Sequence, residues 1–253
     1  MTYYNSINLF NNVGRTVSPG NIGFRGTTVP YTDKFGTGKD SFSTNPLNDF
    51  GNKSSITNIA KSNPEIMRIL KEYKIPLEVN IEELENLKRG HLMNSRITVA
   101  KMYSALPDDL KQKVNMADLQ EAAMLHDYGK VLIPKEILNK KSALTPKEKE
   151  IMDLHSELGY ELLKSKGVRP SVLKLVKYHH QNSNGTGYPK TYNDFEYNTE
   201  LAMLAAADKY SALTENRSYK SAMPRSEALS IIKEDVDTGQ LPQDVYDALE
   251  KST

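Results

Sequence analysis

Five histidines and two aspartates have a spacing that indicates a metal site. All five histidines of the 253-residue chain lie between residues 91 and 180, two of them adjacent and one directly before an aspartate. Each falls on an otherwise apolar helical stripe or at the end of an expected helix. An imidazole or carboxylate buried there without a partner would cost about 1–3 kcal/mol, whereas divalent cations would satisfy the whole set. The candidate ligands are His91, His126, Asp127, His155, His179, His180 and Asp208.

These candidate ligands suffice for two ions. Two bridged metals need about four protein ligands each, and Asp127 can serve as the shared carboxylate. The chain has no cysteine, so the donors are nitrogen and oxygen atoms, which suit Fe, Mn, Co, Ni or Zn. We expect two divalent transition-metal ions, with Fe or Mn favoured. A pair of such ions about 3.5–4 Å apart polarises a phosphoryl oxygen and binds a bridging hydroxide, so the predicted chemistry is hydrolysis of a phosphoester.

Helices must position these side chains, because apolar residues recur at helical spacing from Asn63 onward. Three capping signals mark helix starts: Asn63 before Pro64, Asn80 three residues before Glu83, and Thr145 within the sequence Thr-Pro-Lys-Glu. No segment favours a strand, so the expected fold class is all-α. The expected helices span residues 64 to about 74, 80 through 102, 116 to 126, 145 through 162, 170 to 179 and 200 to 214, with one or two shorter helices between 226 and 250.

The first 60 residues differ from the rest of the chain. Residues 1–55 contain no alanine and no glutamate, and their aromatic residues follow no period. Such a composition cannot bury one face of a helix and is typical of disorder. We therefore expect a disordered tail over residues 1–60 and one helical domain over residues 61–253.

The charge balance and the apolar content exclude several classes of protein. The chain has 33 Lys plus Arg against 32 Asp plus Glu, which argues against bulk nucleic-acid binding. The longest apolar run, Leu201–Ala207, is far shorter than the roughly 20 residues of a membrane-spanning helix. The N-terminal residues lack the pattern of a secretory signal, and cysteine is absent. We expect a cytoplasmic protein that does not bind membranes, and its oligomeric state stays open.

Four motifs carry a resemblance to a known family. The run His126-Asp127-Tyr128-Gly129-Lys130, the single His155, the pair His179-His180 and the run Gly185-Thr186-Gly187-Tyr188-Pro189 are similar to those of the HD-GYP subgroup of HD-domain phosphohydrolases. The motifs occur in the family's order over about residues 88–225. The resemblance implies an HD-domain helical bundle with an interhelical metal centre. It further implies cleavage of the second messenger cyclic di-GMP to linear pGpG or GMP, and a diguanylate cyclase domain as a partner.

The resemblance also implies a role for each matching residue. The seven candidate ligands would bind the metals, with Asp127 bridging them. Lys130 would face the phosphate and stabilise the negative charge that develops on it. Tyr188 would lie near the guanine. Four further residues would bind substrate, namely Gly185 and Gly187 in the loop, and Arg217 and Lys220, which match the family's phosphate-gripping pair.

The chain departs from the family pattern at four positions. Gln181 stands where the family has Glu, and Asn184 where it has Asp; both keep hydrogen-bonding capacity and are expected to affect loop order rather than chemistry. Ser211 replaces an Asp that would position a proton, so slow turnover is an expected consequence. Leu87 replaces the Glu of members with three metals, which favours two metals here.

Alternative interpretations stay open at this point. The domain could be a catalytically weak receptor of a cyclic dinucleotide, or a phosphohydrolase acting on another cyclic dinucleotide or nucleotide, since phosphate-binding side chains do not distinguish bases. A further alternative is a purely structural helical domain in which the polar side chains of the core only bind one another. Locally, Gly185 and Gly187 could be ordinary turn residues and Tyr188 could only pack the loop. Lys209 is expected to be a solvated surface charge.

Overall fold

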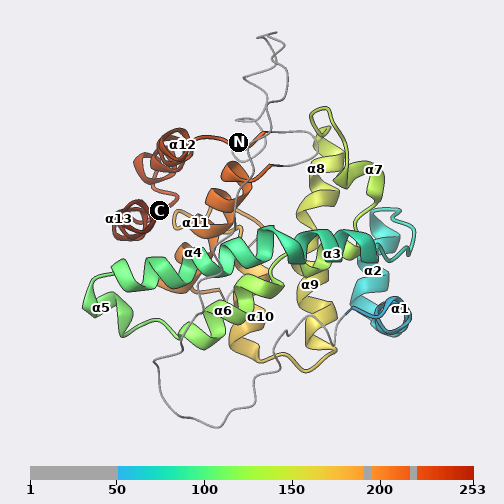
Figure 1. The fold of residues 1–253 in the computed structure, drawn as a ribbon. Helices are drawn as coiled ribbons and strands as arrows, with labels where there is room; N and C mark the ends of the chain where they lie inside the picture. The colour runs from blue at the N-terminus through green and yellow to red at the C-terminus, as the bar shows by residue number, and fades with distance from the viewer. Residues whose placement is uncertain (1–50, 191–194, 217–220) are drawn as a thin grey trace, which may run out of the picture. The chain divides into compact units, whose positions relative to one another are not determined.

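The computed structural model describes residues 51–190, 195–216 and 221–253, and every regular element in these ranges is a helix (Figure 1). The predicted all-α fold class is therefore confirmed. No helix among these residues is long and apolar enough to cross a membrane. The elements are α1 (Lys53–Ser62), α2 (Pro64–Glu72), α3 (Ile81–Arg89), α4 (His91–Ala105), α5 (Asp108–Lys111), α6 (Met116–Leu125), the 3₁₀ helix η3 (Tyr128–Leu132), α7 (Lys135–Leu138), α8 (Pro146–Asp153), α9 (His155–Lys164), α10 (Pro170–Tyr178), α11 (Thr199–Thr214), α12 (Arg225–Asp237) and α13 (Gln243–Ser252).

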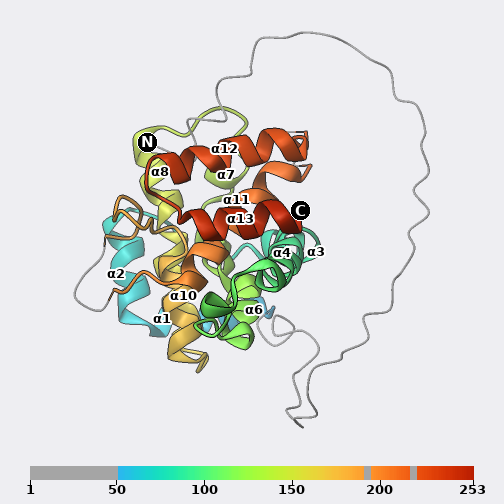
Figure 2. The ribbon, with the colours of Figure 1, turned by 90° about the vertical axis from the view of Figure 1, so that its left-hand side faces the viewer.

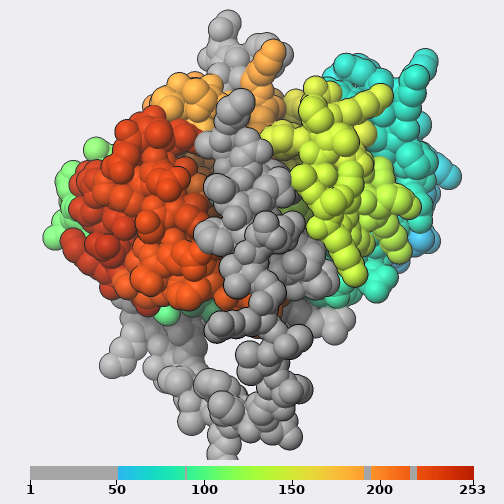
Figure 3. Space-filling model, turned by 90° about the horizontal axis from the view of Figure 1, so that it is seen from above, coloured from blue at the N-terminus to red at the C-terminus, as the bar shows by residue number. Residues whose placement is uncertain are grey.

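Helix α4 is the centre of the packing. It contacts α6, α11 and α13, while α9 contacts η3 and α10. Helices α12 and α13 pack against α11 on one side of the domain, and α1 and α2 pack against α9 on the other (Figure 2). Seen from above, the orange-to-red surface lies on one side, and the yellow-green surface of α7 and α8 lies on the other beside a cyan surface (Figure 3). The elements that carry the candidate ligands therefore meet in the middle of the domain.

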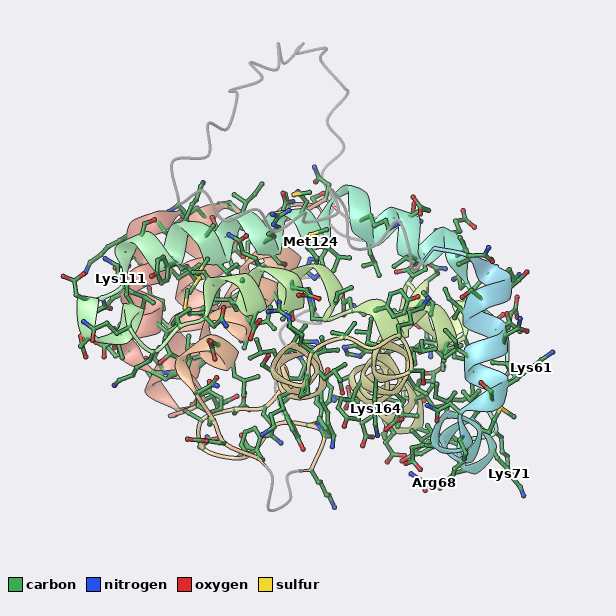
Figure 4. All side chains as sticks on the ribbon, turned by 90° about the horizontal axis from the view of Figure 1, so that it is seen from below. Lys61, Arg68, Lys71, Lys111, Met124 and Lys164 are labelled. Atoms are coloured by element: carbon green, nitrogen blue, oxygen red, sulfur yellow. The ribbon has the colours of Figure 1, made fainter. Side chains whose placement is uncertain are left out.

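The interior is mostly apolar, and the candidate ligands form a large share of its buried polar residues. Met124 of α6 is buried among side chains beneath α4, whereas Lys61, Arg68 and Lys71 project from the outer faces of α1 and α2 (Figure 4). The buried polar residues include six of the seven candidate ligands, and the remaining one, His180, is half-buried. Polar groups gathered inside an apolar core need partners, and their partners decide what the site can do.

Helix starts follow the capping signals of the sequence. The Asn63 side chain accepts hydrogen bonds from the backbone N–H groups of Glu65 and Ile66 at 2.9 and 3.0 Å, which begins α2. Thr145 and Glu148 form a complete capping box at the start of α8. These helix starts could be predicted because each capping side chain accepts hydrogen bonds from backbone N–H groups that a helix leaves unpaired.

Two expected helices are each divided in the structure. The expected helix over residues 80–102 breaks at Gly90, whose φ of −129° and ψ of −87° are not helical, and glycine has the greatest freedom to leave a helix. The expected helix over residues 145–162 breaks at Leu154, between α8 and α9. As a result, His91 and His155 are each the first residue of a helix rather than an interior one.

The predicted disordered tail over residues 1–60 is too long, because its last residues are helical. Residues 53–60 belong to helix α1, which Asn52 caps by accepting a hydrogen bond from the N–H of Ser55 at 3.2 Å. Ile56 and Ala60 lie one turn apart and are fully buried, because α1 packs against α2 and α9. Tertiary packing stabilises this short helix more than its own propensity does. The remainder of the expected tail, residues 1–50, lies outside the described residues.

Candidate metal centre

Three histidines are held in the same way. In each ring, Nδ1 lies within hydrogen-bond distance of the backbone carbonyl oxygen three residues earlier, near the end of a helix. A carbonyl oxygen only accepts, so Nδ1 carries the hydrogen and the Nε2 of the neutral ring presents a bare lone pair. The pairs are His126 with Ala123 at 3.0 Å, His155 with Met152 at 2.8 Å, and His179 with Val176 at 2.7 Å.

The lone pairs of these rings point toward other ring nitrogens. The Nε2 atoms of His155 and His179 are 3.3 Å apart, and those of His126 and His91 are 3.4 Å apart. Burial lowers the pKa of His155 to about 4 and that of His179 well below its usual value, so these two rings are neutral at pH 7. Two unprotonated nitrogens at this distance repel each other unless a cation lies between them. The donor set therefore fits a metal ion.

Two aspartates complete the set. The Oδ1 atom of Asp127 is 3.4 Å from Nε2 of His155, and its Oδ2 atom is 3.5 Å from Nε2 of His91. The carboxylate of Asp208 is 2.9 Å from Nε2 of His91 and 4.0 Å from Nδ1 of His180. Burial alone would raise the pKa of Asp127, but the ammonium group of Lys130, 2.7 Å from Oδ2, helps to hold it well below its usual range. Asp127 thus contacts both ends of the cluster as an anion.

All seven candidate ligands converge in the structure. Their donor atoms form three overlapping groups, and within each group the atoms lie within 4.8 Å of one another. The middle group shares one histidine with each of the others, so the arrangement suits two ions with common ligands. The groups are His155 with His179 and His180; His126 with Asp127 and His179; and His91 with His126 and Asp208.

His91 is held differently from the other buried rings. Its Nδ1 is buried without a hydrogen-bond partner among the described residues, and the closest charged group to this atom is Oε2 of Glu215 at 3.6 Å. Burial alone would lower the pKa of His91, but the carboxylates of Asp208 and Glu215 raise it to about 9 in the absence of metal. Glu215 is not among the residues that the sequence motifs indicated. The available signal was its position seven residues after Asp208, two turns further along the same face.

The glycine-rich loop after α10 places Tyr188 beside the cluster. The Tyr188 ring stacks on His180 with 4.6 Å between centroids, and Nζ of Lys149 lies 5.1 Å from the Tyr188 centroid. A Cβ atom at Gly187 would lie 2.1 Å from the carbonyl oxygen of His180, so only glycine fits there. Gly185 has a φ of +77° and is exposed. Both glycines thus shape the loop that holds Tyr188 in place.

The two amide replacements order this loop as expected. The Gln181 side chain is buried and donates a hydrogen bond to the carbonyl oxygen of Pro189 at 2.6 Å, which a glutamate could not do in its ionised form. Asn184 accepts a hydrogen bond from the backbone N–H of Thr186 at 3.1 Å. Both side chains therefore bind the loop backbone rather than the cluster.

The other residues singled out from the sequence lie outside the cluster or outside the described residues. Lys209 was expected to be a solvated charge, but it is only 7% exposed and lies 2.5 Å from Oδ2 of Asp235, so it joins α11 to α12 inside the domain. Ser211 is 1% exposed, and its hydroxyl has no hydrogen-bond partner within the described residues. Arg217 and Lys220 lie outside the described residues.

Comparisons with known proteins show what the chain is similar to. A protein-family model described as an HD domain matches residues 78–243. The chain is 31% identical over 172 residues to a cyclic di-GMP phosphodiesterase of Thermotoga maritima, covering 67% of this chain and 43% of that protein. It is 31% identical over 134 residues to the 3′3′-cGAMP-specific phosphodiesterase 3 of Vibrio cholerae, covering 53% and 29%. The chain thus spans less than half of the length of either relative.

A solved structure also resembles the chain. The match is to Bd1817, described as an HDG"Y"P protein from Bdellovibrio bacteriovorus, with a TM-score of 0.49 and 18% sequence identity. It covers 81% of this chain and 65% of that one.

Proposed function

Because the chain belongs to the HD domain family, we propose that it is a metal-dependent phosphodiesterase that hydrolyses cyclic di-GMP to linear pGpG or GMP. The observation that carries this proposal is the facing pair of Nε2 atoms of His155 and His179 at 3.3 Å. Each ring is fixed by a backbone carbonyl so that its lone pair points at the other, an arrangement that a cation stabilises. Relatives named as cyclic di-GMP phosphodiesterases support the choice of substrate.

The ions are proposed to be held by seven side chains, with Asp127 shared. When bound, two divalent ions, most suitably Fe or Mn, supply positive charge that polarises a phosphoryl oxygen and lowers the pKa of water. The proposed ligands are buried or half-buried, and surroundings of low dielectric constant strengthen the charge interactions among them. The proposed ligands are His91, His126, Asp127, His155, His179, His180 and Asp208.

Lys130 is proposed to act directly on the substrate. Its ammonium group is half-buried and held 2.7 Å from Oδ2 of Asp127, so a fixed positive charge lies at the edge of the cluster. Such a charge stabilises the negative charge that develops on the phosphoryl oxygens during cleavage. We expect Lys130→Met to lower kcat by about 10²–10³-fold with a smaller effect on KM.

Substrate binding is proposed for the loop after α10 and for the basic residues after α11. Tyr188 is half-buried beside His180, where a ring edge or face can contact the guanine base. Gly185 and Gly187 let the loop backbone approach closely. Arg217 and Lys220 are proposed to bind the substrate phosphates.

A second candidate function is supported by the buried hydroxyl of Ser211. This group stands where the family has an aspartate, and among the described residues it has no hydrogen-bond partner. A hydroxyl keeps its proton at neutral pH, so the site could bind a cyclic dinucleotide and hydrolyse it slowly. A relative named for 3′3′-cGAMP makes that dinucleotide the alternative ligand.

Turnover on a metal-loaded sample tests both candidates. The chain is purified without oxygen, its metal content is measured, and cyclic di-GMP and 3′3′-cGAMP are each supplied to the same sample. The proposal predicts linear pGpG from cyclic di-GMP, and loss of this product in His126→Ala. Tight binding of cyclic di-GMP with no product would favour the receptor instead. Equal turnover by wild type and His126→Ala would exclude a role for the cluster.

A further inference from the structure

The His91 ring lacks the backbone anchor that three of the other four histidine rings share. His126, His155 and His179 each follow a helical turn whose carbonyl accepts their Nδ1–H. His91 is instead the first residue of α4, directly after the break at Gly90, and its buried Nδ1 has no hydrogen-bond partner within the described residues. A metal-ligating histidine almost always donates its second ring N–H to an acceptor, which sets the ring orientation.

Glu215 is placed to be that acceptor. It follows the last residue of α11, and its Oε2 lies 3.6 Å from Nδ1 of His91. Its other oxygen, Oε1, accepts a hydrogen bond from Nδ2 of Asn94 at 2.5 Å. Asn94 stands one turn after His91 on α4. The carboxylate is therefore held against α4 by one oxygen while the other faces the ring.

A small movement would complete the contact. The separation of 3.6 Å is longer than a hydrogen bond by about half an ångström. A cation on Nε2 makes the Nδ1–H group a stronger donor, and hydrogen bonds of this kind often tighten only when a site is loaded.

We propose that Glu215, held by Asn94, is a positioning residue that orients His91 as a metal ligand by accepting its Nδ1–H. The inference rests on the proposed metal centre and adds the side chain that completes it. Asp208, within α11, and Glu215, directly after α11, then act on one ring, Asp208 beside Nε2 and Glu215 beside Nδ1. The pairing also joins the start of α4 to the end of α11.

Metal affinity tests the role of Glu215 apart from activity. Mn²⁺ is titrated by calorimetry into metal-free wild type, Glu215→Gln, Asn94→Ala and the control Glu227→Gln, an exposed residue of α12. Glu215→Gln is expected to weaken Mn²⁺ binding by about 10–100-fold at unchanged stoichiometry, because the orienting acceptor loses its charge. Asn94→Ala is expected to have a smaller effect, and Glu227→Gln none.

Two further readouts separate positioning from a merely structural role. The melting temperature of metal-free Glu215→Gln should match that of wild type, while the visible spectrum of the Co²⁺-loaded form should shift with the changed ligand field. Unchanged affinity and an unchanged spectrum would overturn the inference, and loss of one whole ion would also overturn it by making Glu215 a ligand. Failure of wild type itself to bind Mn²⁺ would overturn the proposed function and this inference together.

Discussion

The two ends of the metal cluster are built by different means. At the end that contains His155 and His179, the backbone fixes both rings through carbonyl oxygens three residues earlier. At the other end, His91 is held by side chains, with Asp208 at one ring nitrogen and Glu215 at the other. A backbone anchor depends on where a helix ends, whereas a side-chain anchor depends on the packing of α4 against α11. Surface mutations should therefore leave the ring orientations at the first end unchanged. At the second end, single substitutions should change the orientation of His91.

Asp127→Asn should have the largest effect, because Asp127 joins the two ends. Its carboxylate contacts both His155 and His91 and holds Lys130. The amide keeps the shape but removes the charge, so hydrolysis should fall by at least about 10³-fold and Mn²⁺ binding should weaken. Steady-state assays measure the first effect and calorimetry the second. Asp244→Asn, an exposed change in α13, serves as the control; similar losses in both variants would argue against a bridging role.

Removal of metal should destabilise the whole domain. The ligands come from α4, α6, α9, α10 and α11, or from residues next to them, so bound ions connect elements distant in sequence. An ion present at 100 times its Kd contributes about 2.7 kcal/mol to the free energy of unfolding. Thermal unfolding with Mn²⁺ and with excess EDTA measures the difference. A melting temperature that does not respond to EDTA would contradict a shared site.

Gly129→Ala should damage the backbone-anchored end selectively. A Cβ atom there would lie 2.0 Å from the carbonyl oxygen of His155 and 2.4 Å from the nitrogen of Gly159, so η3 would be forced away from α9. Overpacking of this kind costs about 1–3 kcal/mol of stability or more, and chemical denaturation measures it. A Cβ at Gly90 meets no atom within 4 Å, so Gly90→Ala, beside His91, is expected to cost less. The reverse order would contradict the comparison of the two ends.

Glu148→Gln should have the smallest effect on the free energy of unfolding. Glu148 lies outside the metal cluster, so the variant is a reference for both ends of it. Hydrogen bonds from Lys140 and Thr145 lower the pKa of Glu148 to about 2, from 4.5. Because the folded-state pKa is the lower one, the ionised group stabilises the fold above pH 4.5, and this stabilisation is lost as the pH falls toward 2. The variant should be slightly less stable than wild type at pH 7, and the two should converge in acid. A constant difference at every pH would refute this assignment.

Local signals allowed much of the fold to be predicted. Asn63 and Thr145 mark helix starts by satisfying nearby backbone donors, and such contacts involve residues only two or three positions apart. The ligand motifs were equally readable, and the resemblance to HD-domain phosphohydrolases is confirmed by the family match. We expected the motif residues to converge because polar side chains buried on apolar faces need partners.

Features that depend on tertiary contact could not be predicted in this way. Lys209 is buried because Asp235, on another helix, pairs with it. No local sequence pattern predicts this pairing. Helix α1 is stabilised because Ile56 and Ala60 are buried where α1 packs against neighbouring helices. Glu215 is distant in sequence from His91 and reaches it only through the packing of α11 on α4.

Anomalous X-ray diffraction from crystals of the chain grown with Mn²⁺ tests the central claim most directly. We expect two anomalous peaks inside the cluster, each within about 2.0–2.4 Å of imidazole nitrogen and carboxylate oxygen atoms, with Asp127 contacting both. Absence of a peak between the Nε2 atoms of the cluster, or a single peak bound by surface carboxylates, would contradict it.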